Sequence, residues 1–206
     1  CTIRSRVTMG LIFAIEGIDQ SGKGMQTKML VERLRKQGHN VELISFPDYF
    51  TIIGKEIKAF LEGDRNYSSQ VRHMLLSLNR WERKDLIDEW FKKGKTVVLD
   101  RYSGSNYAYG LTQGLKLDWL LNLEKGLPEP SITILLDLSP EISLNRKMSG
   151  RDIHERDQEL LKGVRKEYLK LAKRWNWIIV DASSDPNTVH DRIWSKLDNF
   201  IQKSHH

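Results

Sequence analysis

Two glycines and a lysine near the start of the chain have the spacing of a loop that binds phosphate. Residues 17–23 read Gly-Ile-Asp-Gln-Ser-Gly-Lys, between an apolar run and a helix-like run. Gly17 and Gly22 can take backbone angles that other residues disfavour, so the N–H groups of the loop can turn towards one anion. Lys23 adds a charge that can face the β- and γ-phosphates of a nucleotide. The pattern predicts a nucleotide-phosphate site rather than a Gly-rich turn with a solvated lysine.

The next position departs from the motif. A Ser or Thr normally follows the lysine and binds Mg²⁺ through its hydroxyl, but this chain has Gly24. Water can replace a hydroxyl ligand with poorer orientation. We therefore expect Mg²⁺-dependent activity that is measurable but reduced.

An acid and a base follow a second apolar run. Asp100 and Arg101 come directly after Thr-Val-Val-Leu at 96–99. A carboxylate at a strand end can hold Mg²⁺ through water, and an adjacent guanidinium can grip a phosphate with two hydrogen bonds. The alternative is an Asp–Arg ion pair that only closes a loop.

Three other segments carry weaker signals. Tyr49, in Phe-Pro-Asp-Tyr at 46–49, could reach a phosphate, although an ordinary turn explains that segment equally well. Arg80 lies in an apolar helical pattern, and spacing alone favours a core helix with Arg80 reaching solvent. Residues 146–156 are short, polar and basic, as a mobile lid over phosphates would be; the alternative is a solvated helix–helix loop.

The elements that must position these residues alternate along the chain. Short apolar, β-branched runs predict strands at 11–15, 41–46, 96–99, 132–136 and 177–180. Helical patterns occupy 23–37, 53–62, 69–93, 116–123, 140–147, 157–174 and 186–201, with Asp157 a candidate cap for the sixth and Asp185 or Asn187 for the last. This order predicts an α/β fold with a doubly wound, five-stranded parallel sheet. Ligands bind such sheets beyond the carboxyl ends of the strands, where the chemical clusters fall.

Composition narrows the class of protein. The 206 residues suggest one domain, for which we expect residues 9–206, with residues 1–8 an extension outside the fold. The apolar runs are too short to span a membrane, no signal peptide is evident, and Cys1 is the single cysteine, so we expect a cytoplasmic protein without an intrachain disulfide.

The net charge of +6 and the pI near 9.3 suit polyanionic partners. No tract of five basic residues and no aromatic–basic interleaving appears, which argues against nucleic acid and leaves nucleoside phosphates. Most of the basic side chains can equally form a solvated surface.

From Met9 to its end, the chain resembles the thymidylate kinase family. The resemblance rests on residues 13–23, Phe-Pro at 46–47, Leu-Asn-Arg-Trp-Glu at 78–82, Asp-Arg-Tyr at 100–102 with Ser-Asn-Tyr-Ala-Tyr at 105–109, Gly-Leu-Pro-Glu-Pro at 126–130, and Val-Asp-Ala at 180–182. It implies the P-loop nucleoside monophosphate kinase architecture with a short lid at about 147–156. The implied reaction transfers the γ-phosphoryl group of ATP to dTMP, with Mg²⁺, in a cytoplasmic homodimer with no nucleic-acid or membrane partner.

The resemblance also implies roles for individual residues. Asp19 would contact the 3′-hydroxyl of dTMP, Arg101 its phosphate, Arg80 a thymine carbonyl and Tyr109 the deoxyribose. Lys23 would hold the β/γ-phosphates, Arg146 would stack on adenine, and Asp100 would hold Mg²⁺ or its water shell. The remaining expected ATP contacts are Gly17, Ile18, Asp19, Gln20, Ser21, Gly22, Gly24, Met25, Asp181 and Ala182. The remaining expected acceptor contacts are Phe46, Pro47, Tyr49, Leu76, Asp100, Ser105 and His154.

Gln20, Leu76 and Gly24 bear on what the resemblance leaves open. Some members follow the loop aspartate with arginine, but this chain has Gln20, so the catalytic cation should come from the lid, first Arg151 and then Lys147. Leu76 stands where the family has an aromatic residue that stacks on thymine. The alternatives are a nucleotide-binding protein with weakened catalysis, suggested by Gly24, and a kinase for another nucleoside monophosphate, suggested by Leu76.

Overall fold

The computed structural model describes residues 10–146 and 155–203. Its core is one sheet of five parallel strands in the order β2-β3-β1-β4-β5, which confirms the predicted doubly wound sheet. The strands are β1 (Leu11–Glu16), β2 (Val41–Ser45), β3 (Thr96–Asp100), β4 (Ile132–Asp137) and β5 (Ile178–Asp181).

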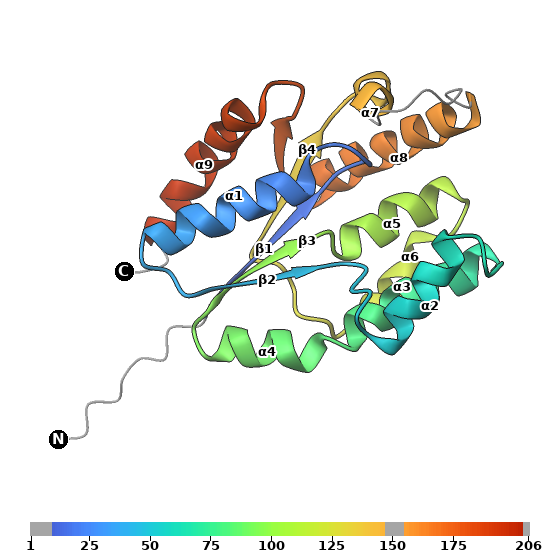
Figure 1. Ribbon diagram of the computed structural model, residues 1–206, viewed down its shortest axis with the longest axis horizontal. Helices are drawn as coiled ribbons and strands as arrows, with labels where there is room; N and C mark the ends of the chain where they lie inside the picture. The colour runs from blue at the N-terminus through green and yellow to red at the C-terminus, as the bar shows by residue number, and fades with distance from the viewer. Residues whose placement is uncertain (1–9, 147–154, 204–206) are drawn as a thin grey trace.

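Helices cover both faces of this sheet (Figure 1). The helices are α1 (Lys23–Lys36), α2 (Ile52–Leu61), α3 (Ser69–Trp81), α4 (Lys84–Lys92), α5 (Ser103–Thr112), α6 (Leu117–Glu124), α7 (Pro140–Arg146), α8 (Glu155–Arg174) and α9 (Pro186–Lys203). None of them, within the part of the chain that the structure describes, is long and apolar enough to cross a membrane.

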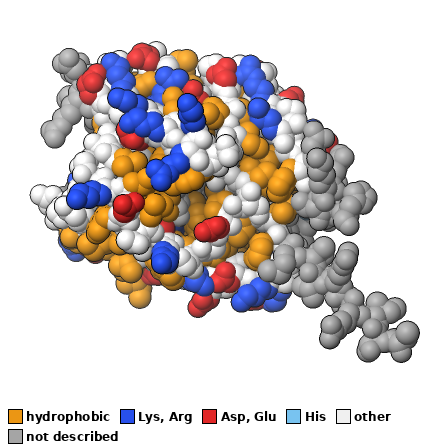
Figure 2. Space-filling view, turned by 180° about the vertical axis from the view of Figure 1, so that it is seen from behind, with side chains coloured by type: hydrophobic (Ala, Val, Ile, Leu, Met, Phe, Trp, Pro, Cys, Tyr) orange, Lys and Arg blue, Asp and Glu red, His pale blue; other side chains and the backbone are white. Residues whose placement is uncertain are grey.

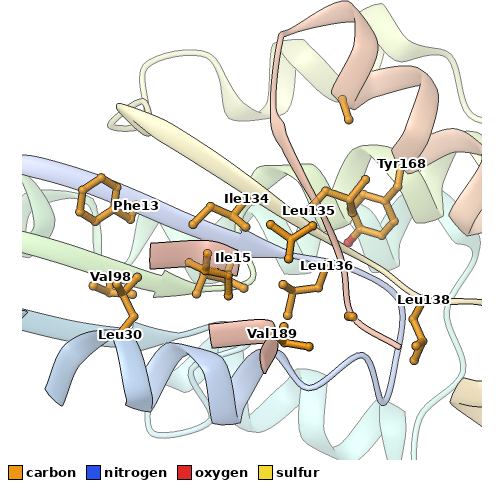
Figure 3. Packing of buried hydrophobic residues seen from close by; sticks show 14 of the residues in the cluster. Phe13, Ile15, Leu30, Val98, Ile134, Leu135, Leu136, Leu138, Tyr168 and Val189 are labelled. Atoms are coloured by element: carbon orange, nitrogen blue, oxygen red, sulfur yellow. The ribbon is translucent and has the colours of Figure 1, made fainter. Parts of the chain in front are cut away.

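The alternation of side chains along β1 explains how the layers form. Phe13 and Ile15 point to one face, where they join Leu30 of α1 (Figure 3). Ile12 points to the other face and joins Ile87 of α4. Successive side chains of a strand face opposite sides, so a strand that is apolar throughout needs helices on both. Glu16 lies on the same face as Ile12 and therefore faces α5 and α8, where two of its hydrogen-bonding partners, Ser105 and Tyr168, lie.

Three sequence predictions about helices were wrong. The pattern over 69–93 is not one helix, because α3 ends at Trp81 and α4 begins at Lys84. Between them, Glu82 accepts a hydrogen bond from the Ile53 N–H and Arg83 pairs with Asp48, so contacts with a distant segment fix the break.

The second error concerns α5, which the sequence analysis missed because Ser-Gly-Ser-Asn lacks an apolar period. The third concerns Asp157, which lies inside α8 rather than at its start. The Asp185 prediction is confirmed: its carboxylate accepts hydrogen bonds from the N–H groups of Asn187 and Thr188 at the start of α9.

Candidate active site

The loop between β1 and α1 has the conformation that the glycine spacing predicted. Gly17 and Gly22 have φ angles of 150° and 90°, in the region that side chains disfavour. A Cβ atom at Gly17 would lie 2.7 Å from the Leu136 carbonyl oxygen, so only glycine fits between the loop and β4. Gly22 then caps the amino end of α1, whose first N–H groups are the natural ligands of a phosphate.

Lys23 is held inside this loop. Its side chain is only 6% exposed, and its Nζ donates to the Ile18 carbonyl oxygen at 2.5 Å and to Ser21 Oγ at 3.3 Å. Burial, with a contribution from the positive charge of Arg101, lowers the pKa of Lys23 to about 7. Without a ligand, the ammonium group therefore lacks enough compensating negative charge, and a bound polyphosphate would supply it.

Asp19, Arg101 and Tyr109 meet beside the loop. The Arg101 guanidinium pairs with the Asp19 carboxylate and also donates to the Gly17 carbonyl oxygen and to Ser105 Oγ, both at 3.3 Å. Arg101 has a φ of 63°, which is strained for a residue with a side chain. The Tyr109 hydroxyl is buried near Asp19 and Arg101, and no group among the described residues meets it with full hydrogen-bond geometry. An orphaned hydroxyl next to a strained cation indicates a place for a ligand.

Glu16 holds this cluster in place through buried hydrogen bonds, a role that sequence reasoning did not assign to it. Its carboxylate is fully buried and accepts hydrogen bonds from Ser105 Oγ at 2.6 Å, the Tyr102 N–H at 2.8 Å and the Tyr168 hydroxyl at 3.0 Å. Burial raises the pKa of Glu16, although these hydrogen bonds favour the carboxylate. Its place at the end of an apolar strand, directly before the glycine, was the only signal in the sequence.

The carboxylate of Asp100 lies close to Gly24. A Cβ at position 24 would stand 3.3 Å from Asp100 Oδ2, so the missing hydroxyl would have been next to this carboxylate. Burial raises the pKa of Asp100, while Lys23 and Arg101 oppose the rise. Among the described residues, no group of three or more His, Cys, Asp or Glu side chains could enclose a metal. The arrangement fits a Mg²⁺ ion held by Asp100, phosphate oxygens and water, which is how Mg²⁺ usually binds in kinases.

A cavity of about 490 Å³ lies beside the loop, between α1 and the segment that joins β5 to α9. Arg146 and Ala182 both line it, and the Arg146 guanidinium donates to the Ala182 carbonyl oxygen at 3.0 Å. Its other lining residues include Gln20, Ser21, Gly22 and Met25. The structure thus brings together several residues expected to contact ATP, among them Arg146, which was expected to stack on adenine. Asp181 does not line the cavity and pairs with Arg192 instead.

Arg80 is not a surface arginine, so the interpretation that spacing alone favoured was wrong. Its side chain is 3% exposed and pairs with Glu124, which is equally buried. Burial disfavours the charge, but Glu124 outweighs burial and raises the pKa of Arg80. Asn106 Nδ2 donates to the same carboxylate at 2.8 Å, and Asn106 Oδ1 meets His73 Nδ1 at 2.6 Å. Sequence reasoning assigned no role to these three partners, because they converge from separate elements.

The other expected acceptor residues flank Arg101 and Arg80. Phe46 and Pro47 follow β2, are joined by a cis peptide bond, and lead into Tyr49. Tyr49 is 41% exposed and lies within electrostatic reach of Arg101 and Asp19. Leu76 is partly buried on α3, one turn before Arg80. Three expected residues, Lys147, Arg151 and His154, lie outside the described residues.

A larger cavity, of about 730 Å³, opens on the α5 and α8 side of the sheet. Trp175, Trp177 and Tyr107 are among its lining residues. None of the described residues that we expect to bind dTMP or ATP lines it.

Seen from behind, the molecule has hydrophobic side chains gathered between charged ones in the middle of the surface (Figure 2).

Comparisons with known proteins agree with the geometry. The family model described as thymidylate kinase matches residues 15–193. The thymidylate kinase of Schizosaccharomyces pombe is 36% identical over 200 residues, which are 95% of each chain. The human thymidylate kinase is 34% identical over 186 residues, covering 89% of this chain and 88% of the human one. A solved structure of Candida albicans thymidylate kinase superposes with a TM-score of 0.81 at 31% identity, over 96% of this chain and 94% of that one; its title attributes broad substrate specificity to that enzyme.

Proposed function

The chain belongs to the thymidylate kinase family and transfers the γ-phosphoryl group of ATP to dTMP, and we propose that the cleft around Lys23, Asp19 and Arg101 performs this transfer. One observation carries the assignment to this cleft. Residues 20–22 of the phosphate-binding loop line the cavity proposed for the donor base, and Asp19 of the same loop pairs with Arg101 beside the buried Tyr109 hydroxyl. Donor and acceptor would thus meet at the loop.

On the acceptor side, Arg101 would bind the phosphate of dTMP, and Asp19 would accept a hydrogen bond from its 3′-hydroxyl. Without a ligand these two side chains neutralise each other. A bound phosphate would take over the Arg101 charge and release the Asp19 carboxylate to accept from a hydroxyl. Arg80, fixed by Glu124, would donate to a thymine carbonyl, and Tyr109 would pack on the deoxyribose, where a 2′-hydroxyl would crowd it. Ser105 would hold Arg101 in place.

On the donor side, Lys23 and the loop N–H groups would hold the β- and γ-phosphates, and Arg146 would stack on adenine. Phosphoryl transfer needs positioning and charge neutralisation more than covalent help. Gln20 carries no charge, so the remaining cation would come from the lid, with Arg151 favoured over Lys147.

We also propose that the reaction requires Mg²⁺. Asp100 would hold the ion or its water shell, and Gly24 supplies no hydroxyl ligand. When bound, the ion would neutralise charge on the phosphate oxygens. The protein would contribute the Asp100 carboxylate, which lies at the end of β3, beside the start of α1.

We further propose a cytoplasmic homodimer. Four apolar side chains, Val71, Met74, Leu78 and Trp81, are each 37–48% exposed and recur at helical spacing along one side of α3. Phe50 and Ile52, at the start of the neighbouring α2, are more exposed still. Exposed apolar side chains on two neighbouring helices favour association, and a second copy of the same surface would cover them.

A coupled assay of ADP release tests the proposed function. The purified protein is given ATP and, in turn, dTMP, dUMP, UMP or CMP, with and without Mg²⁺. We expect turnover that requires Mg²⁺ and is fastest with dTMP. Faster turnover of UMP or CMP would indicate another acceptor, and no turnover with any of the four would indicate a protein that only binds nucleotides.

A further inference from the structure

The segment that follows β2 is held to α3 by one buried side chain. Asn79 is 0% exposed, and its amide is saturated with hydrogen bonds. Oδ1 accepts from the Asp48 N–H at 2.7 Å. Nδ2 donates to Thr51 Oγ1 at 2.8 Å, to the Asp48 carbonyl oxygen at 3.1 Å and to Glu82 Oε2 at 3.2 Å. The side chain thus replaces the backbone partners that residues 48–51 would have in a strand or helix.

Two neighbours of Asn79 reinforce this attachment. Arg83 pairs with the Asp48 carboxylate at 2.7 Å between Nε and Oδ2. Glu82 accepts from the Ile53 N–H at 3.3 Å, in the first turn of α2. Since Thr51 caps α2 by accepting from the Gly54 N–H at 2.9 Å, the same contacts fix where α2 begins. We call Asn79, Glu82 and Arg83 the α3 clamp.

The clamped segment also lies very close to the backbone of α2 at Gly54. A Cβ atom at residue 54 would lie 1.7 Å from the Asp48 carbonyl oxygen and 2.6 Å from its carbon, so the segment rests directly on the backbone of α2. A segment packed this closely on one side and hydrogen-bonded on the other has one well-defined conformation.

That conformation determines where the acceptor side of the site begins. Tyr49 directly follows the clamped Asp48 and lies within electrostatic reach of Arg101 and Asp19. Pro47 directly precedes Asp48. Both ends of the Asn79 amide are already hydrogen-bonded to protein groups, so it does not itself contact a nucleotide in this conformation. Any effect of Asn79 on the reaction would therefore pass through residues 47–51.

We infer that Asn79 is a positioning residue for the acceptor, which holds residues 47–51 at the dTMP side of the cleft and sets the affinity for the acceptor without affecting ATP. The inference rests on the proposed function, because it uses the assignment of Asp19 and Arg101 to the acceptor. Arg80, the next residue in the sequence, has a different role, because its side chain pairs with Glu124 and not with residues 47–51.

The test compares the Michaelis constants for the two substrates. Asn79→Asp keeps an oxygen for the Asp48 N–H but replaces the donating amide by a second oxygen, which would face the Asp48 carbonyl and the Glu82 carboxylate. We expect the KM for dTMP to rise by about tenfold or more, with the KM for ATP and kcat changed by less than about threefold, because weakening the binding of ground state and transition state equally changes KM alone. Asn66→Asp, the same chemical change at an exposed asparagine, should leave all three values unchanged.

A second variant keeps the test decisive if Asn79→Asp does not fold. Arg83 is 31% exposed, so Arg83→Met should fold; it removes the pair with Asp48 and should raise the KM for dTMP by about threefold. An unchanged KM for dTMP in the folded variants, or an equal rise in both KM values, would overturn the inference. A wild-type protein with no turnover of dTMP would instead refute the proposed function.

Discussion

Lys23 carries its charge in a place that disfavours charge. It is buried, its pKa is lowered to about 7, and within residues 10–146 and 155–203 its ammonium group makes hydrogen bonds only to neutral groups of its own loop. The negative charge of Asp19, Asp100 and Glu16 partly offsets the burial. A residue in this state gains from a bound polyphosphate, since the anion restores the preference for the protonated form.

Proton uptake on ATP binding follows from the lowered pKa of Lys23. At about pH 8 the free lysine is mostly neutral, and bound phosphates raise its pKa, so binding should take up close to one proton. At about pH 6 the lysine is already protonated, and little uptake should occur. Calorimetric titration with ATP in two buffers of different ionisation enthalpy measures the number of protons taken up. Lys23→Arg, whose guanidinium does not titrate, should show no uptake at either pH, and equal uptake by both proteins would contradict this explanation.

Gly24 is the residue at which the loop departs from its motif, and its replacement is a direct test. Gly24→Ser would place a hydroxyl next to the Asp100 carboxylate, and we expect kcat in Mg²⁺ to rise by about tenfold, a gain of about 1.4 kcal/mol in the barrier. Gly24→Ala fills the same space without a ligand and should give no gain. A serine variant no faster than the alanine variant would show that Gly24 is not a defect.

The predictability of single residues depends on how local their signal is. Gly17, Gly22 and Lys23 were recognised because a short motif holds the chemistry, and the structure gives them the expected conformation. Glu124 was not recognised, because its partner Arg80 lies 44 residues away and neither position is unusual by itself. The roles assigned to the site residues remain predictions.

At the scale of elements, Gly104 decides how closely α5 approaches β1. A Cβ at this position would lie 2.7 Å from Trp177 Cη2 and 2.8 Å from Glu16 Oε1. Gly104→Ala should therefore push the start of α5 away from Glu16 and lower the free energy of unfolding by about 1–3 kcal/mol, as overpacking usually does.

Thermal and urea unfolding of paired variants measures this effect. Gly24→Ala is the control, since its Cβ meets only the Asp100 carboxylate at 3.3 Å and alanine favours a helix more than glycine does. The control should be as stable as the wild type. Equal stability of the Gly104→Ala protein would mean that the packing of α5 against Glu16 relaxes without cost.

Strands were predicted better than helices, for a physical reason. Each central strand is buried on both faces and must be apolar throughout, so its signal is contained in the strand itself. The carboxyl end of α3 and the start of α4 depend instead on contacts that Glu82 and Arg83 make with residues 48–53. A local sequence pattern does not reveal such contacts. Helix α5 begins with Ser-Gly-Ser-Asn rather than with an apolar pattern, because its first turn carries Ser105 and Asn106 to buried partners.

At the scale of the whole molecule, the apolar side of α3 predicts self-association. Leu78→Glu places a charge in the middle of this surface, where a partner copy would have to bury it. We expect sedimentation equilibrium to give the mass of a dimer for the wild type and that of a monomer for the variant. Leu160→Glu, at a partly exposed leucine of α8, is the control and should stay dimeric. A monomeric wild type would contradict the proposed dimer.

The most direct test of the proposed function follows the phosphoryl group itself. ATP labelled in its γ-phosphate is incubated with dTMP and Mg²⁺, and the products are separated. We expect the label to appear in dTDP, and Arg101→Ala to lower the rate of its appearance by about a hundredfold or more, because the acceptor phosphate loses its cation. Label released only as inorganic phosphate, or transfer to dTMP that Arg101→Ala leaves unchanged, would contradict the proposed function of this cleft.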